Sequence, residues 1–127
     1  MIIYCSLLRS TIEYAAPVYA HFITKEQSDL LERLQSQTLK QIYEYQTSYE
    51  ECLRLSGQER LDERRNKLVI KFTKKACVDL RWEDWFPLHE EYSHDLRRKL
   101  VYREEFSSKE RLRISPVFAM RRIINQI

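Results

Sequence analysis

The sequence predicts an all-α fold, a small helical bundle of about four to six helices with an irregular aromatic and basic C-terminal part. One glycine and three prolines among 127 residues leave few tight turns, whereas an all-β fold needs many. Several stretches repeat apolar residues every three or four positions, which places them on one face of a helix. Hydrophobic residues at 43% and charged residues at 32% indicate a folded chain, whose length suggests a single helical domain over residues 1–127.

The first predicted helix covers residues 2–16. Its apolar face is expected to consist of Ile3, Leu7, Leu8, Ile12 and Ala15, flanked by Tyr4 and Tyr14. Pro17 is expected to end this helix, because a proline disfavours helical geometry in the residue before it. Residues 18–22 then form a short apolar link. Met1 leads almost directly into this helix without a capping residue, so we expect the chain to begin inside a larger architecture.

Capping boxes predict where the next two helices begin. In such a box a hydroxyl residue and a Gln or Glu three positions later satisfy each other's backbone amides. Thr24 precedes Gln27 in the first box, and Ser48 precedes Glu51 in the second. Gly57 is expected to end the shorter helix, because the residue that follows a helix is often left-handed. The core stripe of the longer helix is expected to consist of Leu30, Leu31, Leu34, Thr38 and Ile42.

A helix from Arg60 to Asp79 is predicted to carry two different faces, since no Gly or Pro interrupts the segment. Its apolar residues recur at helical spacing and are Leu61, Leu68, Val69, Phe72 and Ala76. Its basic stripe consists of Arg60, Arg64, Lys67, Lys71 and Lys74. The stripe is about 20 Å long and lies roughly 120° around the helix from the apolar face. It is either a solvated face or a surface that binds a polyanion, and the spacing alone does not decide between them.

The segment after Asp79 is rich in aromatic side chains. Trp82, Trp85 and Phe86 alternate with acidic residues. We expect these rings to pack as a lid over the bundle. Base stacking by exposed rings is the alternative, although the acidic neighbours would repel phosphates. A short helix around residues 95–102 and an extended basic linker at residues 103–113 are expected to follow.

The last predicted helix begins at Ser115 and Pro116, because proline suits the first helical position. Its apolar side chains are expected to dock on the body of the protein or on a partner. Arg121 and Arg122 are expected to face elsewhere.

Charge is distributed unevenly along the chain. Residues 97–127 hold 9 basic and 3 acidic side chains, a balance of +6, whereas residues 1–96 hold 13 and 16, a balance of −3. This asymmetry suggests an anionic partner, although basic tails also serve solubility alone. The tail residues expected to support phosphate binding by the basic stripe are Arg111, Arg113, Arg121 and Arg122.

The sequence contains no pattern typical of a metal site, a cofactor site or a targeting segment. The three cysteines form no Cys-x-x-Cys pair, and the three histidines stand at no zinc-site spacing. We therefore expect free thiols in a reducing, intracellular compartment, either nuclear or cytoplasmic. Arg9 and Glu13 interrupt the apolar N-terminus, which argues against a signal peptide or a membrane span.

An ordered run of residues near the N-terminus resembles a known family. Residues 4–19, YCSLLRSTIEYAAPVY, are similar to the segment that follows the polymerase palm in reverse transcriptases of non-long-terminal-repeat (LINE-type, jockey-like) retrotransposons. Periodicity alone would not dictate this order of residues. The family usually has Trp where Tyr19 stands here and a Thr or Ser cap where Arg60 stands. The resemblance covers nearly the whole chain and continues through residues 27–43, 48–51, 61–75, 85–87 and 111–117.

The resemblance implies a non-catalytic region of the polymerase. The family's catalytic aspartates lie upstream in a Tyr-x-Asp-Asp turn, and no two Asp residues are adjacent here, so we expect no enzyme activity and no cofactor. In the parent enzyme a helical thumb-side region grips the primer–template through phosphates. The expected partners are therefore RNA, DNA or an RNA–DNA hybrid, bound weakly and without sequence preference by the basic stripe. An upstream polymerase portion is a further expected partner, and no membrane is expected.

Two other interpretations stay open. The chain could be a helical interaction module with no nucleic-acid role, which includes self-association. Apolar residues without an obvious partner on the first and last predicted helices favour this class. The chain could also be a retroelement remnant that has no function.

Overall fold

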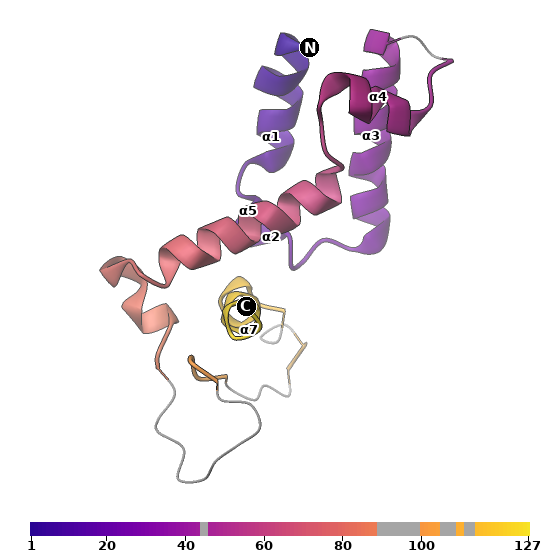
Figure 1. Ribbon diagram of the computed structural model, residues 1–127. Helices are drawn as coiled ribbons and strands as arrows, with labels where there is room; N and C mark the ends of the chain where they lie inside the picture. The colour runs from indigo at the N-terminus through magenta and orange to yellow at the C-terminus, as the bar shows by residue number, and fades with distance from the viewer. Residues whose placement is uncertain (44–45, 89–99, 105–108, 111–113) are drawn as a thin grey trace. The chain divides into compact units, whose positions relative to one another are not determined.

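The computed structural model describes residues 1–43, 46–88, 100–104, 109–110 and 114–127. Over these residues the protein is all-helical, with six α-helices and no strand, which confirms the predicted fold class (Figure 1). The chain forms two compact units. The first consists of Met1–Ala16 and Ile23–Lys67, and the second of Pro17–Phe22 and Leu68–Ile127.

The N-terminal helix is shorter than predicted. It consists of the π-helix η1 (Tyr4–Arg9) and the α-helix α1 (Ser10–Glu13). Tyr14 is already extended, with ψ 129°, and Ala15 takes a left-handed φ of 55°. The prediction that Pro17 ends this helix is wrong, because Pro17 lies in the first turn of the next helix, α2 (Ala16–Tyr19). A proline is tolerated there because the amides of a first turn have no partner within the helix.

The predicted apolar face of this helix is also wrong. Ile3 and Leu7 are 74% and 65% exposed, whereas Tyr4 is 2% exposed. A π-helix closes i→i+5 hydrogen bonds, so its side chains do not follow the spacing of an α-helix. Tyr4 packs with Leu39 and Cys52 in the core of the first unit. Burial raises the pKa of Tyr4 to about 12.

The helix α3 (Lys25–Tyr43) begins at the predicted capping box. The Gln27 N–H donates to Thr24 Oγ1 at 3.2 Å, and the Thr24 N–H donates to Gln27 Oε1 at 3.0 Å. Two of the backbone amides at this helix end that lack an intrahelical partner are therefore satisfied, as the sequence predicts.

The predicted core stripe of α3 is wrong, because its buried residues are Gln35 and Leu39. The expected members Leu30, Leu34 and Ile42 are 57%, 41% and 41% exposed. Gln35 is 1% exposed, and both polar atoms of its side-chain amide have hydrogen-bond partners. Its Oε1 accepts from the Tyr4 hydroxyl at 2.6 Å, and its Nε2 donates to the Tyr49 hydroxyl and to the Glu59 carbonyl, both at 3.0 Å. A satisfied buried amide thus sets the inward face of α3.

The helix α4 (Tyr49–Ser56) begins and ends where the sequence predicts. Ser48 Oγ accepts from the Glu51 N–H at 3.2 Å, although the Glu51 carboxylate pairs with Arg54 and does not close the box. Gly57 takes a left-handed φ of 64°, and its N–H donates to the Arg54 carbonyl at 3.3 Å. Gly57 therefore completes a left-handed C-terminal cap.

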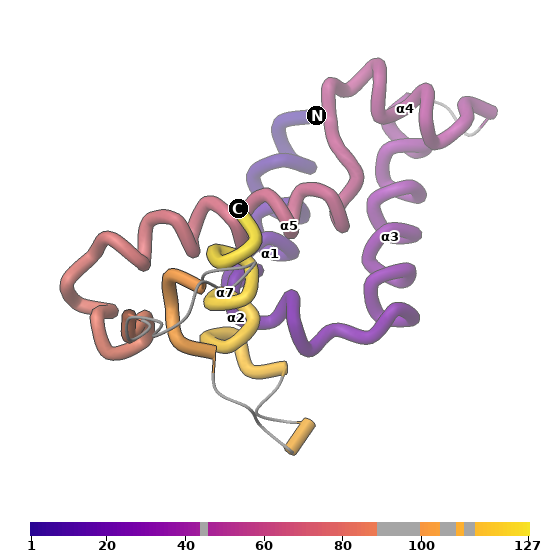
Figure 2. The backbone as a smooth tube through the Cα atoms, turned by 60° about the horizontal axis from the view of Figure 1, so that its bottom comes forward, coloured from indigo at the N-terminus to yellow at the C-terminus, as the bar shows by residue number. Residues whose placement is uncertain are grey.

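The helix α5 (Leu61–Ala76) carries the predicted apolar face. Leu61, Val69 and Ala76 are 1%, 2% and 3% exposed. Figure 2 shows α5 as one continuous helix. Its residues up to Lys67 belong to the first unit and the others to the second.

The core of the second unit consists of Ala76, Phe86 and Met120, against which Phe72, Cys77, Trp82 and Tyr102 pack. The 3₁₀-helix η2 (Leu80–Trp85) brings the tryptophans to this core, and the rings of Trp82 and Trp85 lie 4.4 Å apart. The prediction that these rings pack rather than stay exposed is confirmed for Phe86, which is 4% exposed and belongs to this core. Trp85 is 37% exposed.

The helix α7 (Pro116–Ile124) begins with Ser115 as its N-cap and proline at the start, as predicted. Most of the short helix expected around residues 95–102 lies outside the described residues. Its last residue, Tyr102, forms an antiparallel bridge with Leu88. Residues 105–108 and 111–113 of the expected extended linker lie outside the described residues, and just after the linker the Ile114 N–H donates to the Glu110 carbonyl at 3.0 Å.

Candidate nucleic-acid interface

The predicted basic stripe is divided between the two units, and its first residue, Arg60, lies just before α5. Arg60, Arg64 and Lys67 belong to the first unit, and Lys71 and Lys74 belong to the second. The tail candidates Arg111 and Arg113 lie outside the described residues, whereas Arg121 and Arg122 lie in α7. Each group has a different electrostatic environment.

Every stripe residue of the first unit is paired with a carboxylate. Arg60 Nε lies 3.2 Å from Asp62 Oδ1 and 3.8 Å from a Glu32 carboxylate oxygen. Lys67 Nζ lies 2.6 Å from Glu59 Oε1, and this hydrogen bond lowers the pKa of Glu59. These pairs neutralise positive charge that a phosphate would otherwise meet.

Arg64 shares its carboxylate partner, Glu13, with Arg9, and neither residue was among the predicted site residues. Arg64 Nε donates to Glu13 Oε1 at 3.1 Å, and Arg9 Nε donates to the same oxygen at 2.7 Å. The neighbouring cation Arg65 is 4% exposed and donates to the Ser28 hydroxyl, so it does not contribute to the surface. The spacing of Arg9 and Glu13, four residues apart on a helix, is the signal that could have predicted their pairing.

Lys71 and Lys74 are both exposed. Neither forms an ion pair with any residue that the structure describes. They lie three residues apart in the last turns of α5, followed by the exposed Lys75. Residues three apart are neighbours on a helix surface, and cations at a helix C-terminus are stabilised by its dipole. These ammonium groups are available to an external anion.

Arg121 does not face away from the core as expected, because it is 6% exposed. Its Nε donates to the Trp85 carbonyl at 2.6 Å, and its guanidinium carbon lies 5.3 Å from the centre of the Phe118 ring. A cation over an aromatic face is attracted by the ring quadrupole. Arg121 thus joins η2 to α7. Arg122 is half-buried, and burial of His21, followed by the positive charge of Arg122, lowers the pKa of His21.

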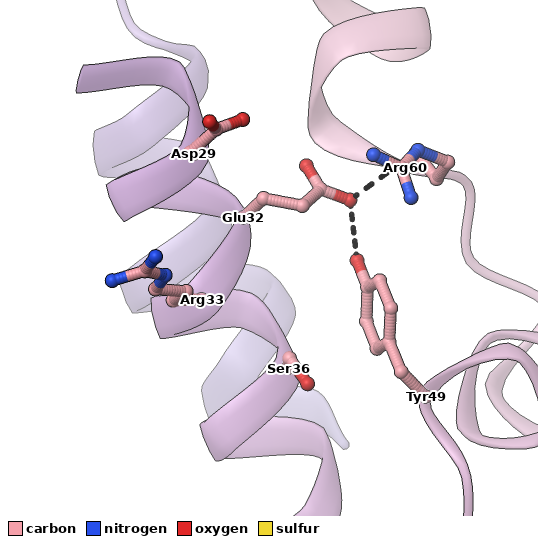
Figure 3. A pocket seen from close by; sticks show the side chains of 6 residues that line it. All are labelled: Asp29, Glu32, Arg33, Ser36, Tyr49 and Arg60. Carbon is pink, nitrogen blue, oxygen red and sulfur yellow. Dashed lines mark hydrogen bonds and ion pairs between the residues drawn. The ribbon is translucent and has the colours of Figure 1, made fainter. Parts of the chain in front are cut away.

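A polar pocket of about 280 Å³ opens beside α3 in the first unit. In Figure 3 the Glu32 carboxylate points toward both Arg60 and Tyr49. The Tyr49 hydroxyl donates to Glu32 Oε1 at 2.6 Å, and burial together with this hydrogen bond raises the pKa of Tyr49. Two acidic and two basic residues line the pocket, so their charges balance. The pocket is lined by Asp29, Glu32, Arg33, Ser36, Tyr49 and Arg60.

The structure thus defines a small all-helical protein with two exposed lysines on one helix that form no ion pair with the described residues. In the described part of the chain no helix is both long and apolar enough to cross a membrane. Nor do three or more His, Cys, Asp or Glu side chains of that part gather closely enough to hold a metal ion. Comparison with protein families, curated proteins and solved structures finds no match for the chain.

Proposed function

We propose that this chain is a non-catalytic helical element like the one that follows the palm in non-long-terminal-repeat reverse transcriptases. It binds nucleic-acid backbones weakly and without sequence preference. The resemblance of residues 4–19 and 61–75 to that family and the all-helical fold support this proposal. The purified chain is accordingly expected to extend no primer with magnesium or manganese.

The observation that carries the proposal is the exposure of Lys71 and Lys74 without a carboxylate partner among the described residues. An ammonium group that contacts a phosphate releases counterions from the nucleic acid, and this release drives binding. Lysines contact the backbone as point charges and read no bases. Only a few contacts are available, so the affinity is low and falls as salt rises.

The test is the binding of a fluorescent RNA–DNA hybrid at several salt concentrations. The double substitution Lys71→Glu with Lys74→Glu should abolish binding while the helix content measured by circular dichroism stays unchanged. Lys25→Glu with Lys40→Glu on α3 changes the net charge equally and serves as the control. Equal binding by the two double variants would contradict the proposal.

A second candidate function is protein interaction through the N-terminal helix. Ile2, Ile3 and Leu7 are 85%, 74% and 65% exposed. The hydroxyls of Ser6 and Thr11 donate to carbonyls of their own helix, so they offer no proton outward. Exposed apolar surface of this kind marks interaction sites. Self-association that persists at high salt and is lost in Ile3→Glu would favour this function.

A further inference from the structure

Two arginines from different helices converge on a single carboxylate oxygen in the first unit. Glu13 Oε1 accepts from Arg9 Nε at 2.7 Å and from Arg64 Nε at 3.1 Å. The side chains of Arg9 and Glu13 are 15% and 16% exposed, whereas that of Arg64 is 38% exposed. The cluster is therefore mostly enclosed and opens to solvent on the side of Arg64.

This arrangement is one that suits a phosphate. Guanidinium groups have several N–H donors in a fixed plane, which match carboxylate and phosphate oxygens alike. Two guanidinium groups carry two positive charges, and the Glu13 carboxylate supplies one negative charge. The Glu59 carboxylate also interacts with both arginines, but it is paired with Lys67, so this second pair adds one charge of each sign and the excess of one positive charge remains. A backbone phosphate would place an oxygen where Glu13 Oε1 lies and could accept from both arginines.

The geometry points to a latent phosphate-binding site formed by Arg9 and Arg64, which the Glu13 carboxylate holds closed. This inference rests on the proposed function, because the expected ligand is a phosphate of a nucleic-acid backbone. Arg9 and Arg64 hold the phosphate, and Glu13 competes with it for the same N–H groups. The chain then has an internal competitor that limits how strongly it binds nucleic acid.

The position of Glu13 at a helix end favours its displacement by a phosphate. Glu13 is the last residue of α1, and the chain leaves the helix at Tyr14. A carboxylate at the C-terminal end of a helix is disfavoured by the helix dipole. The two arginines offset this unfavourable position, and a phosphate that binds them would release Glu13 from it.

The experiment compares Glu13→Gln with Glu63→Gln in binding a 20-base-pair DNA duplex. Glu63 is exposed and forms no side-chain ion pair within the described part of the chain, so its substitution changes the net charge equally without releasing an arginine. Each additional phosphate contact steepens the logarithmic salt dependence by about 0.9 on B-form DNA. Glu13→Gln should therefore steepen it by about 0.9 or more relative to Glu63→Gln.

The double variant Glu13→Gln with Arg64→Gln keeps the test valid if Glu13→Gln changes the fold. The gain of Glu13→Gln should disappear in this double variant while the helix content remains that of the parent chain. Equal salt dependence in Glu13→Gln and Glu63→Gln, or a gain that survives without Arg64, would overturn the inference. Binding by the parent chain tests the proposed function separately. If the parent chain binds DNA and Glu13→Gln does not steepen the salt dependence, only the latent site is ruled out. If the parent chain does not bind DNA, the proposed function is ruled out.

Discussion

The two halves of α5 carry cations at the same spacing, but those of the first half are paired with carboxylates and those of the second half are not, within the described residues. In the first half, Arg64 and Lys67 each lie within 3.1 Å of a carboxylate oxygen. In the second half, Lys71 and Lys74 have no such partner within the described residues. The carboxylates come from other parts of the chain, so a regular stripe in the sequence becomes a short binding surface in the structure.

The largest expected effect comes from removing the side chain that anchors the first half. Leu61 is 1% exposed, and Leu61→Ala should lower the free energy of unfolding by about 2–5 kcal/mol, the range for deleting a buried leucine. Urea unfolding followed by circular dichroism measures this loss. Leu55→Ala is the control, because Leu55 is 52% exposed and its loss should cost far less. Similar losses in both variants would show that α5 is not anchored at Leu61.

The turn that leads into the first half should give the next largest effect. Gly57 has a left-handed φ of 64°, and a Cβ there would meet no atom within 4 Å, so only backbone strain opposes Gly57→Ala. This strain should lower the free energy of unfolding by about 1–2 kcal/mol. Gly57→Asn should cost less, because asparagine tolerates the left-handed region better than alanine. Thermal unfolding of both variants compares the two costs, and an equal cost would rule out strain as the cause.

Acid should affect the unit that contains Lys71 and Lys74, because His21 belongs to it. Burial, followed by the charge of Arg122, lowers the pKa of His21 below its usual value of 6.5. The unfolded chain then binds more protons than the folded one, so stability is full above pH 6.5 and falls as pH drops toward the lowered pKa. Melting curves between pH 5 and pH 8, about the range in which histidine titrates, should show this loss. The slope should flatten in His21→Gln, and an unchanged slope in that variant would assign the acid sensitivity to other groups.

The smallest effect should come from freeing a single cation of the first half. Glu59→Gln removes the carboxylate that lies 2.6 Å from Lys67 Nζ. Lys67 should then resemble Lys71 and add one phosphate contact, which steepens the salt dependence by about 0.9 on B-form DNA. The duplex titration measures this change against Glu63→Gln. A salt dependence equal to that of the control would show that the paired state of Lys67 is not what keeps it from phosphates.

Features set by short-range chemistry could be predicted from the sequence. Gly57 ends α4 because only its own backbone conformation matters, and Thr24 with Gln27 caps α3 through bonds between near neighbours. The helical spacing of apolar residues likewise predicted that Leu61 and Val69 are buried.

Features set by distant partners could not be predicted. Gln35 faces inward because it forms hydrogen bonds with Tyr49, Glu59 and Tyr4, which lie 14, 24 and 31 positions away in the sequence. Arg121 is buried because the Trp85 carbonyl, 36 positions earlier, accepts from it. For the candidate site, spacing found the cations of α5 but not Glu13, which lies 51 positions from Arg64. The charge that each cation presents depends on such partners, which no local pattern records.

The most direct test neutralises each half of the stripe in turn. Arg60→Gln with Lys67→Gln and Lys71→Gln with Lys74→Gln each remove two positive charges from the basic stripe. With a DNA duplex at several salt concentrations, the second variant should lose most of the binding and about 1.8 of the logarithmic salt dependence, whereas the first should stay close to the parent. Equal losses in both variants would show that the whole stripe binds phosphates and that its carboxylate partners do not matter.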